Sequence, residues 1–377
     1  MFTLLKNATI YAPEYIGKKS VLIFDQQIIA IEDEFSALPF KVNTVDCSNK
    51  ILASGFIDQH IHLIGGGGEA GFNSRTPAVT LSKLIEAGLT TVVGVLGTDG
   101  ISRSPKDLYA KAQALTLEGI QAYIHTGSYE LPTRTITSNI RDDITFIPSV
   151  LGVKIALADH RSSFPTLQEL LRIVSDIRIG SMLAGKKGLL HIHLGGLPDG
   201  FDLINAVVDA GLPIHHLSPT HVGRTEALFE QAIDFAKTGG HIDITSGGSR
   251  FMPQEDAIQM ALNAGVTYKQ ITISSDGNGS VPRFNAQGKV DGLGSAPVDG
   301  NIKLLPKLID KGIPLEHIFS MFTSNVASSL GIQAGRIAIG QRADLCLFND
   351  DMSLERVYAK GQLMLERNQF VAHGNFE

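Results

Sequence analysis

The sequence lacks tryptophan altogether and has only 2 cysteines among its 377 residues. Cys47 and Cys346 are too far apart for a metal-finger spacing and too few for a disulfide framework, so we expect a reducing, cytoplasmic setting. There is no apolar run of about 18 residues to span a membrane, and the first residues lack the features of a cleavable signal peptide. These absences exclude disulfide-stapled and membrane-embedded classes of protein.

An excess of positive charge is also missing. The chain has 32 Lys and Arg residues against 38 Asp and Glu residues, which gives a formal net charge of −6. This balance disfavours nucleic acids and anionic membrane surfaces as partners and favours a small soluble ligand. What the chain does have is 12 histidines, and where these fall matters more than their number.

The middle of the chain alternates short β-like runs with amphipathic stretches of helical spacing that end at glycines, as expected for parallel βα units. Eight such units over about 270 residues predict an α/β fold of the (β/α)8 TIM-like barrel type. The predicted strands cover residues 55–63, 90–97, 121–128, 152–158, 189–195, 214–222, 241–246 and 271–275.

The two ends of the chain carry short strands broken by turn residues, and neither end is long enough to build a core alone. We therefore expect residues 1–52 and 333–377 to meet in one small β-sandwich domain, beside a catalytic barrel formed by residues 53–332. Both cysteines would then belong to the small domain.

Active sites of such barrels lie at the carboxyl ends of the strands. The first predicted strand ends in Asp-Gln-His-Ile-His, and side chains two apart in a strand point to the same side, so His60 and His62 are placed to chelate one ion. The alternative is two polar residues with a structural role at a strand end.

Lys154 lies inside an otherwise apolar run on the fourth predicted strand. Burial disfavours the charged ammonium and pushes the lysine towards the neutral amine. Such an amine adds carbon dioxide to form a carbamate, which has two oxygens to bridge two metal ions. The other interpretation, a lysine that extends to the barrel rim, stays open on this evidence.

Further candidate ligands end the fifth, sixth and eighth strands. His191 and His193 lie on the fifth, His221 follows the sixth, and Asp276 follows the eighth, where a carboxylate can bind a metal or act as a general base. Polar residues at so many strand ends of one barrel predict a metal centre.

This order of residues resembles the amidohydrolase superfamily of the binuclear metal subtype. Within it, the sequence most resembles the family of bacterial isoaspartyl dipeptidases, and the likeness extends from the first residues to Met364. The stretches that carry it are GFIDQHIHLIGGGGEAG (55–71), VVGVLGTD (92–99), TGSYELPTRT (126–135), GVKIALADHRS (152–162), PTHVGR (219–224), GGHIDITS (239–246), SSDGNGS (274–280) and GRIAIGQRADLCLF (335–348).

The resemblance implies two divalent metal ions per chain, with zinc expected and cobalt or manganese open. It implies that Lys154 is carbamylated (N6-carboxylysine) and bridges the ions. His193 is preferred to His191 because it lies nearer the strand end, although the reverse stays open. The implied ligands are His60 and His62 for one ion, His193 and His221 for the other, the Lys154 carbamate between them, and Asp276.

The same resemblance implies the substrate-binding residues. Glu69 would pair with a free α-amino group, and Tyr129 would support the carbonyl oxygen as it becomes an oxyanion. Arg161 and Arg224 would engage carboxylates through their planar guanidinium groups. Hydrogen bonds would come from Gly67, Thr98 and Ser280.

The implied activity is hydrolysis of dipeptides linked through the β-carboxyl group of aspartate, which releases aspartate and an amino acid. A bridging hydroxide would attack, with Asp276 taking its proton and passing it to the leaving amine. The family further implies a homo-oligomer, an octamer. The segment 283–298 is glycine-rich and is a candidate lid.

Three other interpretations are less well supported. A cyclic amide hydrolase of the dihydroorotase or hydantoinase type would act on an uncharged ring, whereas Glu69, Tyr129 and the pair Arg161 and Arg224 fit a zwitterionic dipeptide better. A non-catalytic scaffold would be expected to lack several metal ligands, and all six are present. A mononuclear deaminase would not need Lys154.

Overall fold

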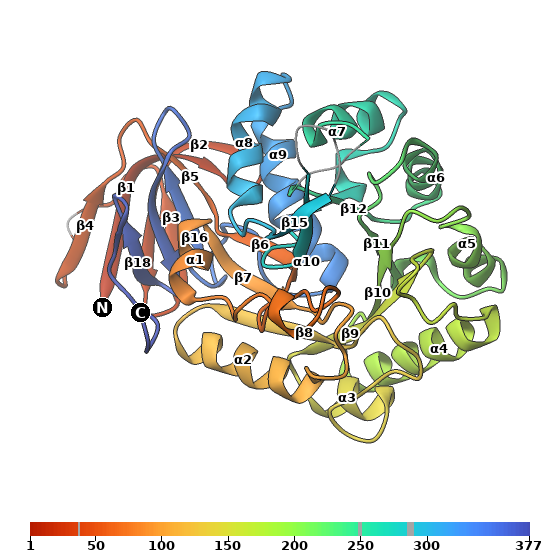
Figure 1. The fold of residues 1–377 in the computed structure, drawn as a ribbon. Helices are drawn as coiled ribbons and strands as arrows, with labels where there is room; N and C mark the ends of the chain where they lie inside the picture. Colours follow the sequence, from red (N-terminus) through yellow and green to blue (C-terminus); the bar gives the residue numbers. More distant parts are fainter. Residues whose placement is uncertain (37, 248–250, 285–289) are drawn as a thin grey trace.

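The computed structural model describes residues 1–36, 38–247, 251–284 and 290–377. Its central element is a sheet of eight parallel strands in sequential order, which curves into a barrel (Figure 1). All eight predicted strands are confirmed. They are β6 (Phe56–Ile61), β7 (Leu89–Gly94), β8 (Gln121–Gly127), β9 (Val150–Leu157), β10 (Leu189–Leu194), β11 (Leu217–Thr220), β12 (Ile242–Thr245) and β13 (Ile271–Ser274).

The first and last strands of the barrel meet just beyond their carboxyl ends. The backbone N–H of His62 donates to the carbonyl of Gly277 over 2.9 Å, and Ile61 forms a parallel bridge with the same residue. This contact brings the end of β6 beside the end of β13, so the histidines of the first strand lie next to Asp276.

Helices surround the barrel strands (Figure 1). Local sequence fixes several of their ends: the Ser104 side chain caps α2, Thr166 and Glu169 form a capping box on α4, and Gly185 ends α4 with φ of 64°. The helices are α1 (Leu81–Glu86), α2 (Pro105–Leu117), α3 (Ile140–Phe146), α4 (Leu167–Ala184), α5 (Asp202–Asp209), α6 (Glu226–Lys237), α7 (Gln254–Asn263), α8 (Gly300–Asp310), α9 (Leu315–Phe322) and α10 (Ser324–Leu330), with short 3₁₀ turns at Phe72–Ser74, Ile214–His216 and Tyr268–Gln270.

The two ends of the chain meet in a separate sheet, as expected. Its nine strands form one continuous sheet, in which β5 joins the N-terminal strands to the C-terminal ones. The strands are β1 (Phe2–Tyr11), β2 (Tyr15–Phe24), β3 (Gln27–Glu32), β4 (Val42–Asp46), β5 (Ile51–Ser54), β16 (Leu345–Phe348), β17 (Leu354–Ala359), β18 (Gln362–Glu366) and β19 (Gln369–Phe370).

This sheet folds over its own core and also packs against the barrel. Ile28 of β3 is hydrogen-bonded through its backbone to Gln341 over 2.9 Å, so the sheet encloses a core that includes Cys47. On the other face, Phe348 packs 6.0 Å from Phe56 at the start of β6, measured between ring centroids. Cys346 belongs to that second core. None of the helices in the described ranges has the length and hydropathy needed to cross a membrane.

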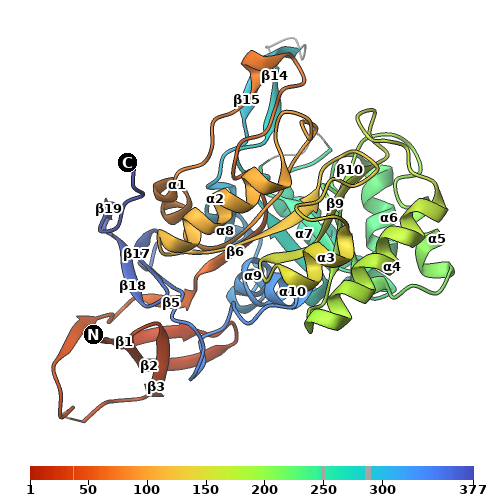
Figure 2. The same ribbon diagram turned by 90° about the horizontal axis from the view of Figure 1, so that it is seen from below.

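The glycine-rich segment 283–298 differs from the loop that the sequence suggested. Its described part belongs to an antiparallel hairpin of β14 (Ser280–Phe284) and β15 (Val290–Ser295), which projects from the barrel (Figure 2). Residues 285–289, including Gly288, lie outside the described residues. The lid stays a prediction.

Candidate active site

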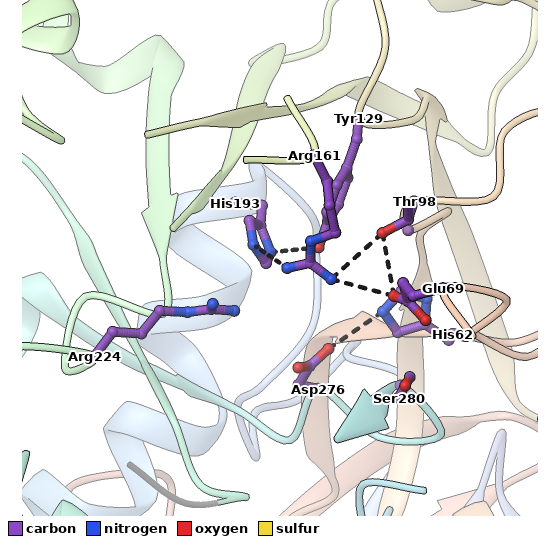
Figure 3. A pocket seen from close by; sticks show the side chains of 12 residues that line it. His62, Glu69, Thr98, Tyr129, Arg161, His193, Arg224, Asp276 and Ser280 are labelled. Carbon is purple, nitrogen blue, oxygen red and sulfur yellow. Dashed lines mark hydrogen bonds and ion pairs between the residues drawn. The ribbon is translucent and has the colours of Figure 1, made fainter. Parts of the chain in front are cut away.

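A cavity lies at the carboxyl ends of the barrel strands (Figure 3). All the substrate-binding residues predicted from the sequence line it. The predicted metal ligands His62 and His193 and the predicted general base Asp276 line it as well. The lining residues are His62, Gly67, Glu69, Gly97, Thr98, Tyr129, Arg161, His193, Arg224, Asp276, Gly279 and Ser280.

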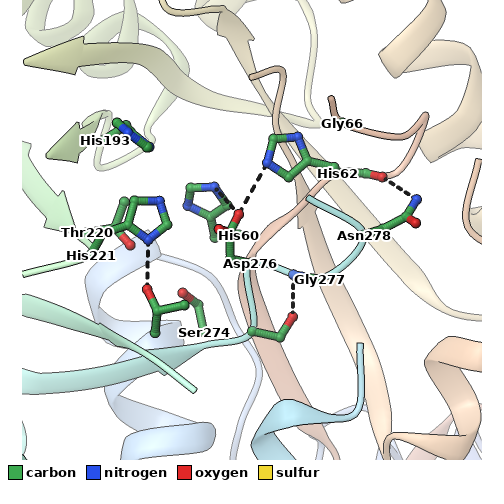
Figure 4. Close-up of polar contacts among 12 residues, drawn as sticks. His60, His62, Gly66, His193, Thr220, His221, Ser274, Asp276, Gly277 and Asn278 are labelled. Atoms are coloured by element: carbon green, nitrogen blue, oxygen red, sulfur yellow. Dashed lines mark hydrogen bonds and ion pairs between the residues drawn. The ribbon is translucent and has the colours of Figure 1, made fainter. Parts of the chain in front are cut away.

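The predicted metal ligands form a cluster at the floor of this cavity (Figure 4). Oδ1 of Asp276 lies 3.3 Å from Nε2 of His60 and 3.2 Å from Nε2 of His62. The His221 ring lies 4.8 Å from the His60 ring and 4.6 Å from the His193 ring, between centroids. Among the described residues, ligand atoms of His60, His221 and Asp276 all lie within 4.8 Å of one another.

Unusual backbone geometry positions two of these ligands. His221 directly follows β11, and Asp276 lies two residues after β13. Their φ angles are 61° and 54°, a left-handed conformation that is uncommon outside glycine. Gly279 packs against Asp276: a Cβ there would lie 2.9 Å from Asp276 Oδ1 and 3.1 Å from His62 Cδ2. Position 279, in the turn after β13, therefore has room for glycine only.

Burial controls the charge of the cluster. It lowers the pKa of Lys154 to about 7, and it lowers the pKa of His60, His193 and His221 well below the usual value, with the nearby lysine adding to the effect. Burial would raise the pKa of Asp276, but its histidine and lysine neighbours hold it well below its usual range. The cluster thus presents neutral imidazoles and an ionised carboxylate, which are the forms that bind metals.

The donor atoms of the cluster fit divalent metal ions. Nδ1 of His221 is 2.7 Å from Oγ1 of Thr245, while Nε2 of the same ring is buried and has no hydrogen-bond partner within the described part of the chain. A ring held through one nitrogen with the other left free in a cluster is the usual arrangement of a metal ligand. Lys154 is fully buried, with Nζ 3.3 Å from Nε2 of His60, and forms no ion pair with any described residue.

Charged side chains line the cavity together with the histidines (Figure 3). Nη1 of Arg161 lies 3.1 Å from Oε1 of Glu69, to which Oγ1 of Thr98 also donates over 3.2 Å. The Arg161 guanidinium lies over the Tyr129 ring, 5.3 Å from its centroid. Burial raises the pKa of Tyr129, so its hydroxyl stays a hydrogen-bond donor.

The sequence pattern of the amidohydrolase family matches residues 51–364, which is most of the chain. The chain belongs to the amidohydrolase family. A β-aspartyl dipeptidase from Fervidobacterium islandicum AW-1, solved in complex with the dipeptide β-Asp-Leu, is 42% identical in sequence to this amidohydrolase. The two structures superpose with a TM-score of 0.93, covering 98% of this chain and 97% of that one.

Two more distant relatives show how far the fold extends. Dihydropyrimidinase from Brevibacillus agri NCHU1002 is 17% identical with a TM-score of 0.72, covering 99% of this chain and 97% of its own, a likeness that shows the fold alone. A deacetylase from Brucella anthropi is 24% identical over 355 residues, covering 90% of this chain and 81% of its own.

The two histidines of β10 occupy different places in this amidohydrolase. His193 lines the cavity, whereas His191 lies deeper, with Nε2 2.9 Å from Nδ1 of His60 and Nδ1 3.0 Å from Oγ of Ser218. The choice of His193 over His191 as the metal ligand stays a prediction.

Sequence reasoning missed Asp159, which contacts His193 and Arg161 of the predicted set. Its carboxylate is 3% exposed and accepts from Nε and Nη2 of Arg161, both over 2.8 Å, and lies 3.0 Å from Nε2 of His193. Burial would raise its pKa, yet these hydrogen bonds hold the pKa of Asp159 below its usual range. The available signal was its place just after β9, at a strand end like Asp276.

Proposed function

We propose that this amidohydrolase hydrolyses β-aspartyl dipeptides and releases aspartate and an amino acid. The observation that carries the proposal is the juxtaposition of Glu69, Arg161 and Asp276 in one cavity. An isoaspartyl unit has a free amino group and a free carboxylate on the same carbon, so one acidic and one basic side chain can bind both. The 42% identical structure that holds β-Asp-Leu supports this substrate class.

The cluster would hold two divalent metal ions, for which we propose zinc because all the donors are nitrogen and oxygen. His60 and His62 would bind one ion, His193 and His221 the other, with Asp276 and a carbamate on Lys154 completing the set. When bound, the ions would polarise the scissile carbonyl and lower the pKa of the attacking water. The full burial of Lys154, which lowers its pKa to about 7 and favours the neutral amine, supports the carbamate.

Two side chains of the cavity supply the proton transfer and the stabilisation of negative charge. Asp276 takes the proton of the attacking water and passes it to the leaving amine as the C–N bond breaks. The Tyr129 hydroxyl donates a hydrogen bond to the carbonyl oxygen, where negative charge develops. A carboxylate already held ionised and a phenol already held neutral suit these two roles.

Specificity follows from the charged side chains. Glu69 binds the α-amino group, and Arg161 and Arg224 bind the two carboxylates of the dipeptide, with additional hydrogen bonds from Gly67, Thr98 and Ser280. An α-linked dipeptide cannot offer its amino group and carboxylate from one carbon, so charged side chains of the cavity would be left without partners, which is costly.

Purified protein provides the decisive test. We expect it to release free aspartate from β-Asp-Leu, to leave α-Asp-Leu intact, and to contain about two metal ions per chain. Comparable turnover of dihydroorotate would favour the cyclic amide hydrolase instead. Absence of all hydrolysis at full metal loading would support a non-catalytic scaffold.

Three further features stay predictions: the domain boundaries at residues 52–53 and 332–333, a cytoplasmic location, and a homo-octamer. The buried, unpaired thiols of Cys47 and Cys346 accord with a reducing compartment. Sedimentation or light scattering on the purified protein tests the oligomeric state directly.

A further inference from the structure

We propose that Asp159 is a positioning residue that fixes a metal-binding histidine and a substrate-binding arginine relative to each other. It belongs to neither of the residue sets already assigned, but it contacts both. Oδ2 lies 3.0 Å from Nε2 of His193 and accepts from Nη2 of Arg161 over 2.8 Å, while Oδ1 accepts from Nε of Arg161 over 2.8 Å. This inference rests on the proposed function and extends it.

The contact with His193 selects one form of the imidazole ring. A carboxylate accepts hydrogen bonds, so Nε2 of His193 carries the proton and Nδ1 does not. Nδ1 lies 2.5 Å from the hydroxyl of Tyr129 and, carrying no proton, accepts a hydrogen bond from it. Its lone pair is the one that a metal ion would take in place of that hydrogen bond, and Asp159 orients the ring through Nε2.

The contact with Arg161 sets the direction of its guanidinium group. Two N–H groups of the arginine are held by Asp159, and its backbone N–H also donates to Oδ1 over 2.9 Å. Nη1 remains directed at Glu69 and Thr98 in the cavity. The aspartate is almost fully buried, and its negative charge offsets the positive charge of Arg161 and, at 4.0 Å, of Arg224.

The two contacts share one oxygen, Oδ2, so the position of the arginine is tied to the position of the histidine. A shift of Asp159 would move both the second metal site and the substrate carboxylate site. A residue with only a structural role in the loop after β9 would affect neither.

The test compares Asp159→Asn with a matched control, Asp143→Asn. Asp143 is equally buried and accepts hydrogen bonds from Thr126, Ile136 and Thr137, but it has no contact with the cluster. Both variants are loaded with zinc or cobalt and dialysed against a chelator without substrate. Metal per chain is then measured, and the visible absorption of the cobalt forms is recorded.

We expect Asp159→Asn to bind one of the two ions about 10- to 100-fold more weakly and to alter the cobalt spectrum. Asp143→Asn should lose thermal stability while keeping both ions. If the asparagine variant does not fold, Asp159→Glu, which keeps the charge but displaces the carboxylate, should show a smaller loss of the same ion. Wild-type affinity for both ions in Asp159→Asn would overturn the proposal.

Arg161→Met separates the two contacts of Asp159. This variant should keep both ions and raise the KM for β-Asp-Leu, because only the substrate contact is removed. Loss of an ion in this variant would overturn the inference that Asp159 orients His193. The metal measurements use no substrate. Failure of the wild-type enzyme to cleave β-Asp-Leu would therefore refute the proposed function while leaving the metal contact of Asp159 supported.

Discussion

Glu69 and Arg161 are 92 residues apart in the sequence, yet they form a 3.1 Å ion pair at the mouth of the barrel. One follows β6 and the other follows β9, and the barrel brings the two loops together. A zwitterionic ligand can replace this ion pair, because its cationic group can bind the glutamate and its anionic group can bind the arginine. In this ion pair each of the two charged side chains of the cavity has a partner of opposite charge.

Replacing Glu69 with glutamine keeps the shape of the side chain and removes its charge. We expect kcat/KM for β-Asp-Leu to fall roughly 10- to 150-fold, the worth of one charged hydrogen bond. Steady-state kinetics measure this. Glu169→Gln, at the capping box of α4 far from the cavity, is the control and should leave kinetics unchanged. Equal kinetics for Glu69→Gln and the wild type would remove Glu69 from the substrate site.

Lys154→Met keeps the length of the side chain but cannot form a carbamate. We expect metal content to fall and hydrolysis to be lost, while the melting temperature of the metal-free protein stays close to that of the wild type, because an apolar side chain suits the buried site. Elemental analysis and calorimetry report the two quantities. Two ions per chain with normal turnover would show that no carbamate bridge is needed.

Gly279→Ala tests the close approach beside the cluster. Its Cβ would lie 2.9 Å from Asp276 Oδ1, so the carboxylate must shift. We expect a roughly 5- to 150-fold loss of activity, since overpacking costs about 1–3 kcal/mol. Gly196→Ala is the matched control, because a Cβ at that glycine meets no atom within 4 Å. Similar activities of the two variants would show that the turn adapts.

The two thiols predict how stability changes at alkaline pH. Burial raises the pKa of Cys47 to about 11 and that of Cys346 to about 12, from an ordinary value of 9.0. The unfolded chain therefore releases these protons at lower pH than the folded chain. The contribution of the protonated thiols is complete below pH 9 and is lost as the pH rises towards 11 and 12.

Denaturant titrations between pH 8 and 11 measure this loss, with Cys47→Ala and Cys346→Ala as controls that should show a weaker pH dependence. Alkylation provides a second check. The thiols of the native protein should resist an alkylating reagent at neutral pH and react after unfolding, and rapid labelling of the native protein would contradict the burial of both residues.

The sequence by itself determined the elements of the barrel. Strand and helix periodicities, and glycines such as Gly185 that end helices, are local properties, so all eight strands could be located without the structure. Residue position along a strand likewise brought His60, His62 and Asp276 into one predicted site. The resemblance to known families added the roles of the loop residues.

Only the tertiary structure decided the contacts between loops. The pairing of Asp159 with His193, the place of His191 behind His60, and the ion pair of Glu69 with Arg161 all depend on how the barrel closes. The hairpin of β14 and β15 and the way the small sheet folds over itself depend on long-range pairing too. Periodicity reports which face of a strand is buried, but the partner across a loop is fixed by three-dimensional packing.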